Sequence, residues 1–398
     1  MVAQRGLRPN GSEDHQTVGG GPFHSPIPAP TSVSGNAPYP HAVYYCNQDG
    51  GALIAGGSTA AYCALSLDGG ATYQQAEPIY TLVQCGGLHG HLRVAPDGAA
   101  VIPNQDCGPS ADVANAAGTF TNQAAVVTTN NGLSWTVDVI PGSHASLRSD
   151  PAVAFDKAGS MYFAYEDGTF ANSDLSDLSK QIGGRAMLAT SSDEGAHWST
   201  PVDVGASLGI KNVTFPEVIA GDAGHAAYAF LGSTTAGNPE DKSFQGFWYL
   251  YVAITADGGK TWTTTNLTPG DPVERDCIYL AGDGNCPSAK RNLLDFMDIT
   301  ADKEGRVLIG YADGCTDACV TQQTQPCADA ICSKGSNAST DTMSAIARED
   351  LPSLAATVPV ETPEVPWTPS LVFASALGVA GVWWRRSRRH RGALTTSS

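Results

Sequence analysis

Short runs that alternate apolar and polar residues recur along the middle of the chain, and each pair of runs flanks a turn containing Asp and Gly. Copies cover residues 91–98, 150–159, 217–224 and 298–305, and a degenerate copy covers residues 42–51. Such alternation favours half-buried strands, and Asp with Gly favours tight turns. The pattern predicts inner β-hairpins that start near Val43, Val94, Val153, Val218 and Ile299.

A second pattern, S/T-x-D/N-x-G-x-x-aromatic, occurs four times at intervals of about 63 residues. The copies cover residues 66–73, 128–135, 191–198 and 255–262. In such a turn the Asx side chain accepts backbone N–H groups, the Gly adopts positive φ, and the aromatic ring covers the turn. The residues assigned to these structural roles are Asp68, Asn131, Asp193 and Asp257, with the aromatics Tyr73, Trp135, Trp198 and Trp262.

The two patterns alternate, so that each unit of about 60 residues contains two hairpins and therefore four short strands. Even spacing of short strands within a long repeat is typical of β-propeller blades. We therefore expect an all-β fold over residues 42–350, with about five four-stranded blades and negligible helix before residue 351.

The two ends of the chain differ from this body. Residues 1–41 are rich in Gly, Pro, Ser and His and are expected to be irregular or left over from an upstream segment. Residues 351–370 contain five prolines and are expected to form an extended linker. Residues 371–384 are uncharged and mostly apolar, and five arginines follow. We interpret residues 371–398 as a short transmembrane segment with a basic cytoplasmic tail; the alternative is a buried core helix.

This C-terminal arrangement resembles the tripartite sorting signals of bacterial and archaeal surface proteins. It implies an extracellular body anchored to the cell surface or membrane. Residues 1–40 contain no apolar stretch of the signal-peptide kind. We therefore expect Met1 not to be the natural start, and a first blade to be missing from this chain.

Charge and cysteine content narrow the function. The formal net charge is −17, and an acidic surface repels phosphate backbones, which argues against nucleic-acid binding. Ten cysteines lack the spacing of zinc ligands and fit disulfides in an oxidising compartment. Local closures such as Cys277 with Cys286, or Cys85 with Cys107, are candidates only, and the CxxxC of Cys315 and Cys319 is weak evidence for a metal.

The eight-residue pattern is similar to the Asp box of BNR-repeat, sialidase-like propellers, and residues 42–350 resemble exo-α-sialidase-like proteins. The segments 86–91 and 291–298 look like shared signatures of that group. The resemblance implies a six-bladed propeller with Asp boxes on the rim opposite the substrate face. For a sialidase it implies three arginines that clamp a sugar carboxylate, a Tyr nucleophile activated by a Glu, and an Asp acid/base. The F/Y-R-I-P motif that normally carries the first arginine is missing from this sequence.

The loops that enter the inner strands are unusually polar, and in a propeller such loops line a central funnel. If the protein is a hydrolase, Glu217 would activate a Tyr, and Asp150 or Asp298 would be the acid. The expected substrate-binding residues are Arg93, Arg148, Arg291, His89, His91 and Asp295. Each of these residues has a structural alternative as a turn cap or salt-bridge partner. A metal site at His89, His91 and Asp150 is a weaker alternative, and we expect no cofactor.

Two functions from different classes remain. The first is a sialidase-type glycoside hydrolase that releases terminal sialic acid or a related anionic sugar. The second is a non-catalytic propeller that binds glycan or protein at the cell surface. Both predict a glycan or glycoprotein partner and a monomeric chain, with a membrane contact only through the C-terminal segment.

Overall fold

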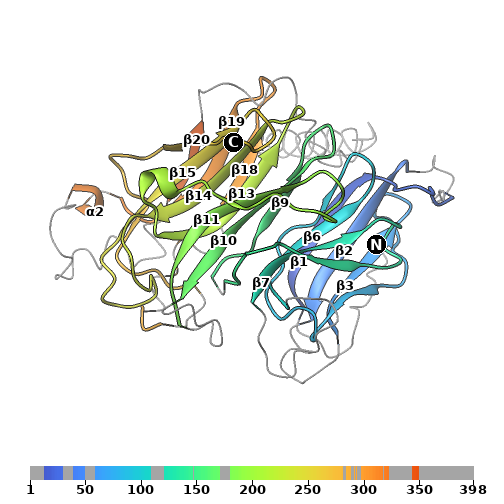
Figure 1. Cartoon of the computed structure of the whole chain (residues 1–398), viewed down its shortest axis with the longest axis horizontal. Helices are drawn as coiled ribbons and strands as arrows, with labels where there is room; N and C mark the ends of the chain where they lie inside the picture. The colour runs from blue at the N-terminus through green and yellow to red at the C-terminus, as the bar shows by residue number, and fades with distance from the viewer. Residues whose placement is uncertain are drawn as a thin grey trace, which may run out of the picture. The chain divides into compact units, whose positions relative to one another are not determined.

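The computed structural model describes residues 13–29, 39–49, 59–108, 121–146, 148–170, 180–280, 284–287, 291, 293, 297–316, 318–321 and 343–348. Within these residues, five antiparallel sheets follow one another in chain order, from the blue first sheet to the orange fifth sheet in Figure 1. The expected linker and transmembrane segment lie outside the described residues. Among the residues that are described, no helix is long and apolar enough to span a bilayer.

Each of the first four sheets contains four strands in sequence order. The first contains β1 (Glu13–Pro22), β2 (His41–Asp49), β3 (Thr59–Ser66) and β4 (Glu77–Thr81). The second contains β5 (Arg93–Val94), β6 (Ala100–Cys107), β7 (Asn122–Thr128) and β8 (Thr136–Val139). The third contains β9 (Ala152–Phe155), β10 (Met161–Phe170), β11 (Gln181–Ser191) and β12 (Val202–Asp203).

The fourth sheet contains β13 (Asn212–Ala220), β14 (Ala226–Ser233), β15 (Phe247–Thr255) and β16 (Thr263–Asn266), and β17 (Glu274–Arg275) also pairs with β15. The fifth has three described strands, β18 (Asp298–Ala301), β19 (Val307–Asp313) and β20 (Met343–Arg348). Helix in the described part is limited to the four-residue α2 (Ala318–Thr321) and the 3₁₀ turn η3 (Ala206–Leu208). The all-β expectation is confirmed.

The first strand of each sheet lies against the first strand of the next. The contacts run in the order β1, β5, β9, β13 and β18. Apolar side chains fill the space between successive sheets: Tyr44 and Ile102 share one cluster, and Phe163 lies with Val101 in the next. This arrangement brings the start of every sheet close to the start of its neighbours, and the candidate site depends on it.

β1 is the main departure from the expected organisation, because it lies within residues 1–41 and pairs with β2. Its sequence lacks apolar alternation because glycines stand where it meets β5. A Cβ atom on Gly19 would lie 2.4 Å from Leu92 Cδ2, and one on Gly21 would lie 2.7 Å from Val94 Cβ. Glycine weakens an isolated strand, but here it permits the close approach of two backbones. The inner strand of the first sheet is therefore β1, and the strand at Val43 is second.

The four eight-residue segments form the same hydrogen-bonded turn between the third and fourth strands of the first four sheets. The backbone N–H of Thr261 donates to Asp257 Oδ1 at 3.0 Å, and Thr72 donates to Asp68 at 2.8 Å. The corresponding bond from His197 to Asp193 is 2.9 Å. The repeated sequence thus encodes a repeated turn, as expected.

In the second turn, the assignment of Asn131 needs correction by one residue. Asn130 holds the equivalent position, because its Oδ1 accepts the backbone N–H of Ser134 at 3.0 Å. Asn131 instead adopts φ 59°, in the place that Gly69 occupies in the first turn. The Asn131 side chain accepts the backbone N–H of His24 at 2.9 Å and donates to the His24 carbonyl at 2.8 Å. It therefore ties the segment after β1 to the second sheet.

Eight described cysteines form four disulfides, and the described part contains no free cysteine. The local closures Cys85–Cys107 and Cys277–Cys286 are confirmed. The CxxxC pair is also a disulfide, which removes it as a metal-ligand candidate. Four disulfides are typical of a protein in an oxidising, extracellular compartment.

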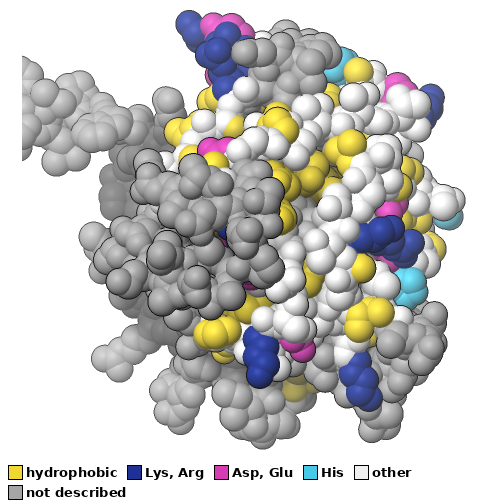
Figure 2. Space-filling view, turned by 90° about the vertical axis from the view of Figure 1, so that its left-hand side faces the viewer, with side chains coloured by type: hydrophobic (Ala, Val, Ile, Leu, Met, Phe, Trp, Pro, Cys, Tyr) yellow, Lys and Arg dark blue, Asp and Glu magenta, His cyan; other side chains and the backbone are white. Residues whose placement is uncertain are grey.

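On the face shown in Figure 2, Lys and Arg side chains are dispersed, and several lie beside acidic ones. Two ion pairs of the described residues have short distances: Lys157 Nζ lies 2.6 Å from Asp222 Oδ1, and Arg306 Nε lies 2.6 Å from Asp302 Oδ2. No basic patch forms on the described part of that face.

Candidate functional site

Titratable side chains from all five sheets come together where the inner strands begin. β1 contributes His15, the segment leading into β5 contributes His89 and His91, and β5 itself contributes Arg93. Asp150 precedes β9, Glu217 lies in β13 and Asp298 starts β18. The His15 Nδ1 atom lies 3.0 Å from Asp150 Oδ2, and the rings of His15 and His89 are 6.1 Å apart. We call these seven residues the inner-strand cluster.

Glu217 owes its position to a β-bulge in β13. The register between β13 and β14 shifts between Thr214 and Glu217. Pro216 lies in the bulge, where its missing N–H costs no ladder hydrogen bond, and Phe215 adopts φ 53°. Bulges bend a strand and redirect the side chains that follow. The residues Phe215 and Pro216 thus interrupt the in–out alternation of side chains in β13 just before the carboxyl group of Glu217.

The charge state of Glu217 is set by its surroundings. Burial raises the pKa of Glu217 to about 8, although the positive charge of Arg93 acts in the opposite direction. The carboxylates of Asp298 and Asp150 add to the rise. Glu217 is therefore protonated at neutral pH and can donate a proton. The same charges show that Glu217 lies within electrostatic reach of three other members of the cluster.

The two histidines before β5 are uncharged at neutral pH. Burial lowers the pKa of His89 to about 4, and its Nδ1 lies 3.0 Å from the Gly90 carbonyl oxygen. Its Nε2 is buried and has no hydrogen-bond partner among the described residues. Burial and the charge of Arg93 lower the pKa of His91 as well. Arg93 is thus the main positive charge of the inner-strand cluster.

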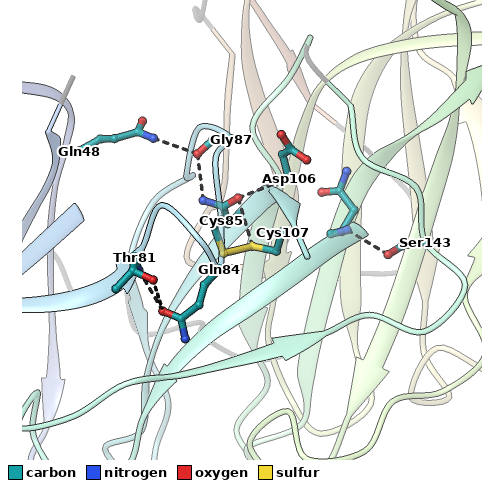
Figure 3. The surroundings of a disulfide bond; sticks show 10 residues. Gln48, Thr81, Gln84, Cys85, Gly87, Asp106, Cys107 and Ser143 are labelled. Atoms are coloured by element: carbon teal, nitrogen blue, oxygen red, sulfur yellow. Dashed lines mark hydrogen bonds between the residues drawn. A yellow bond between two sulfur atoms is a disulfide. The ribbon is translucent and has the colours of Figure 1, made fainter. Parts of the chain in front are cut away.

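The segment that carries these histidines is fixed by the Cys85–Cys107 disulfide (Figure 3). Gln48 Nε2 donates to the Gly87 carbonyl at 2.9 Å. A Cβ atom on Gly87 would lie 2.4 Å from Asp106 Cβ, and one on Gly90 would lie 2.0 Å from the Pro151 oxygen. The Gly-rich sequence of residues 86–91 is therefore needed for close packing beside the site.

His15 is the cluster residue that sequence reasoning missed, because residues 1–41 were expected to be irregular. It lies at a register shift between Asp14 and Thr17 in β1 and adopts φ 46°. Positive φ is uncommon for a residue other than glycine, and such residues concentrate at functional sites. The 3.0 Å contact between His15 Nδ1 and Asp150 Oδ2 joins β1 to the segment that precedes β9. Nothing in the local sequence signals this partner.

Arg148 does not join the inner-strand cluster. Its side chain is completely buried, and one Nη donates to the Gln181 carbonyl at 2.6 Å and to Asn238 Oδ1 at 3.0 Å. Its Nε lies 3.9 Å from Glu240 Oε2. The positive charge of Arg148 also acts on buried Glu166, whose pKa burial nevertheless raises to about 7. Arg148 thus links the third and fourth sheets from the interior.

Arg291 and Asp295 are the remaining predicted residues. The guanidinium of Arg291 lies 6.0 Å from the centre of the Tyr279 ring. Asp295 lies outside the described residues. Of the three predicted clamp arginines, Arg93 is the one whose positive charge acts on Glu217 and His91. Among the described residues, no group of three or more His, Cys, Asp or Glu side chains has a metal-binding arrangement.

No known family model and no curated protein sequence matches the chain. Among solved structures, a protein of unknown function from Dyadobacter fermentans is 14% identical, with a TM-score of 0.41 and 75% of each chain covered. Hadza microbial sialidase Hz136 is 16% identical with a TM-score of 0.38, covering 68% of this chain and 47% of the sialidase. The GH93 α-L-arabinofuranosidase of Fusarium graminearum is 11% identical with a TM-score of 0.39, covering 73% of each.

This chain spans about half the length of that sialidase. At these identities and TM-scores, the similarities assign neither residue roles nor an activity to the chain. The functional proposal below therefore depends on the inner-strand cluster itself.

Proposed function

We propose that the chain is a glycan-active hydrolase whose general acid is Glu217. The observation that carries this proposal is the convergence of Glu217, Asp150 and Asp298, in which burial and the two other carboxylates raise the pKa of Glu217 to about 8. Glycoside hydrolysis uses two carboxyl groups in opposite states, one that protonates the leaving oxygen and one that acts as base or nucleophile. A buried carboxyl group with a raised pKa is suited to the first of these two roles.

This proposal reverses the role that sequence reasoning gave to Glu217. A base must be ionised at the working pH, whereas Glu217 is protonated below about pH 8. In our proposal Glu217 donates its proton to the glycosidic oxygen as the bond to the sugar breaks. Asp150 or Asp298 supplies the carboxylate, and Arg93 orients the substrate by hydrogen bonds.

A terminal sialic acid, or a related anionic sugar, is the more specific form of the proposal. Its support is Arg93, an exposed residue of the cluster, since arginine recognises carboxylates in a bidentate geometry. The burial of Arg148 weakens it, because that side chain is completely enclosed in the interior. Surface anchoring is a separate proposal, supported by the apolar and arginine-rich sequence of residues 371–391.

A second candidate is a non-catalytic propeller that binds glycan without turnover. The specific observation in its favour is again Arg148, whose completely buried side chain is unsuited to hold a substrate carboxylate. In this candidate the inner-strand cluster would recognise a sugar by hydrogen bonds alone.

Incubation of the purified chain with a fluorogenic sialoside and a panel of other glycosides tests both candidates. We expect release from at least one substrate, reduced roughly 10²- to 10⁴-fold by Glu217→Gln, as for loss of a general acid. Saturable glycan binding without release by the wild-type chain would support the binding module. If the wild-type chain shows no release and no glycan binding, both candidates are overturned.

A further inference from the structure

Ser149 joins two parts of the site that are far apart in sequence. It lies directly before Asp150 and is 5% exposed. Its Oγ accepts the backbone N–H of Phe215 at 3.1 Å and lies 2.7 Å from Thr214 Oγ1. Phe215 and Thr214 form the bulge that precedes Glu217. One hydroxyl therefore connects the residue beside Asp150 to the bulge beside Glu217.

The bulge needs this support because its backbone is strained. Phe215 adopts φ 53°, a left-handed conformation in which a side chain crowds its own backbone. Such conformations persist only where the surroundings hold them. The N–H of Phe215 points to Ser149 rather than into the β13–β14 ladder, whose register resumes at Glu217. The Ser149 hydroxyl is thus a specific partner of the strained residue.

Ser149 is itself held firmly from its other side. In the orientation of the Gln105 amide in which its nitrogen donates and its oxygen accepts, the nitrogen donates to the Ser149 carbonyl at 2.8 Å. The neighbouring Asp150 is held by His15 at 3.0 Å. Ser149 and Asp150 are therefore tied to β6 and β1, which gives the bulge a rigid anchor.

We propose that Ser149 is a positioning residue that holds the β13 bulge and thereby sets the place of the Glu217 carboxyl in the inner-strand cluster. This inference rests on the proposed hydrolase function for its kinetic consequence. Without Ser149 the bulge relaxes toward a regular strand, Glu217 turns toward water, and its proton is held less tightly. Thr214 supports the same geometry through its hydroxyl.

The test compares Ser149→Ala with Ser143→Ala. Ser143 is a matched control, because its buried Oγ accepts the backbone N–H of Gln123 at 3.0 Å and donates to the Ile140 carbonyl at 2.7 Å. Both variants lose one buried hydroxyl from the segment between β8 and β9. Only Ser149→Ala removes a hydroxyl that contacts β13. Thermal unfolding, pH–rate profiles of glycan release and the titration of ¹³C-labelled glutamate carboxyl groups are measured for each.

For Ser149→Ala we expect kcat to fall about tenfold or more with KM changed less than about twofold, and the alkaline limb to move to lower pH by about half a unit or more. For Ser143→Ala we expect a comparable loss of Tm and an unchanged pH profile. Ser149→Thr, which keeps the hydroxyl, should restore the profile. Equal effects of both alanine variants on the profile would overturn the proposal.

The carboxyl titration separates this proposal from the proposed function. If no glycoside is cleaved, a fall in the pKa of Glu217 in Ser149→Ala still supports the positioning role, and an unchanged pKa contradicts it. If Ser149→Ala does not fold, Thr214→Val removes only the second hydroxyl. It should move the Glu217 pKa in the same direction by a smaller amount, and no movement would overturn the proposal.

Discussion

At the level of single residues, Glu217 and Arg148 show that partners decide chemistry more than residue type does. Both are charged residue types near the start of an inner strand. Glu217 lies at the inner-strand cluster with a raised pKa, whereas Arg148 is enclosed by Gln181 and Asn238. Sequence reasoning could place both near the site, but it could not separate them. The partners of Arg148 lie 33 and 90 residues further along the chain.

Glu217→Gln should make stability less dependent on pH. A carboxyl whose pKa is raised by folding favours the folded state at low pH and loses that contribution as pH rises from its unfolded value to about 8. The amide cannot ionise, so we expect similar Tm values near pH 4.5 and a Tm higher by a few degrees in the variant at pH 8.5. Differential scanning calorimetry across this range measures the difference, and a pH-independent difference would contradict the prediction.

Arg93→Gln should move the same titration upward. The positive charge of Arg93 lowers the pKa of Glu217, and its removal leaves burial and the neighbouring carboxylates to raise it further. We expect the alkaline limb of the activity profile, or the directly titrated Glu217 carboxyl, to shift to higher pH. Arg306→Gln is the control, because Arg306 pairs with Asp302 at a surface turn and should leave the titration unchanged.

At the level of elements, local patterns were predictable and long-range packing was not. The eight-residue turns and the later inner hairpins depend on residues within a few positions of one another, so their sequence encodes them directly. β1 depends instead on Leu92 and Val94, about 70 residues away. The glycines of β1 and their near neighbours in sequence do not predict a strand. The bulge at Phe215 likewise has a distant partner in Ser149, which lies in the segment before β9.

Gly19→Ala should destabilise the protein more than Gly20→Ala. The new Cβ at Gly19 would lie 2.4 Å from Leu92 Cδ2 and 2.8 Å from the Leu92 oxygen, whereas at Gly20 the nearest atom is 3.0 Å away. Overpacking of this kind typically costs about 1–3 kcal/mol. Chemical denaturation of both variants gives the comparison. Equal losses would show that β1 and β5 are less closely packed than described.

At the level of the whole molecule, the candidate site needs all five sheets, because each supplies at least one member of the inner-strand cluster. The segment after β1 also connects the first sheet to the second and third sheets. His24 bonds to Asn131 in the second sheet, and its Nε2 lies 3.7 Å from Glu194 Oε1 in the third. The order of the sheets was predictable from the repeat period. The convergence of charged side chains from different sheets was also expected, but which side chains converge depends on the three-dimensional structure.

Removal of the Cys85–Cys107 disulfide should reduce both stability and site function. The bond joins residues 22 apart, and loop-closure entropy gives a loss of about 3 kcal/mol for the double alanine variant. The double alanine variant of Cys315 and Cys319, which are 4 apart, should lose about 2 kcal/mol. Urea unfolding measures both. Glycan release or binding should fall only in the first, and an equal fall in both would contradict the link to residues 86–93.

The connection from His24 to Glu194 also has a consequence for the time course of synthesis. About 170 residues separate the two partners. At roughly 5–20 residues per second, a ribosome needs on the order of 10–35 s to add them. During that interval β1 has already been synthesised, whereas the last of the residues that enclose it has not. Chaperones that bind exposed strands would therefore meet β1 before Leu92, Asn131 and Glu194 are available to hold it in place.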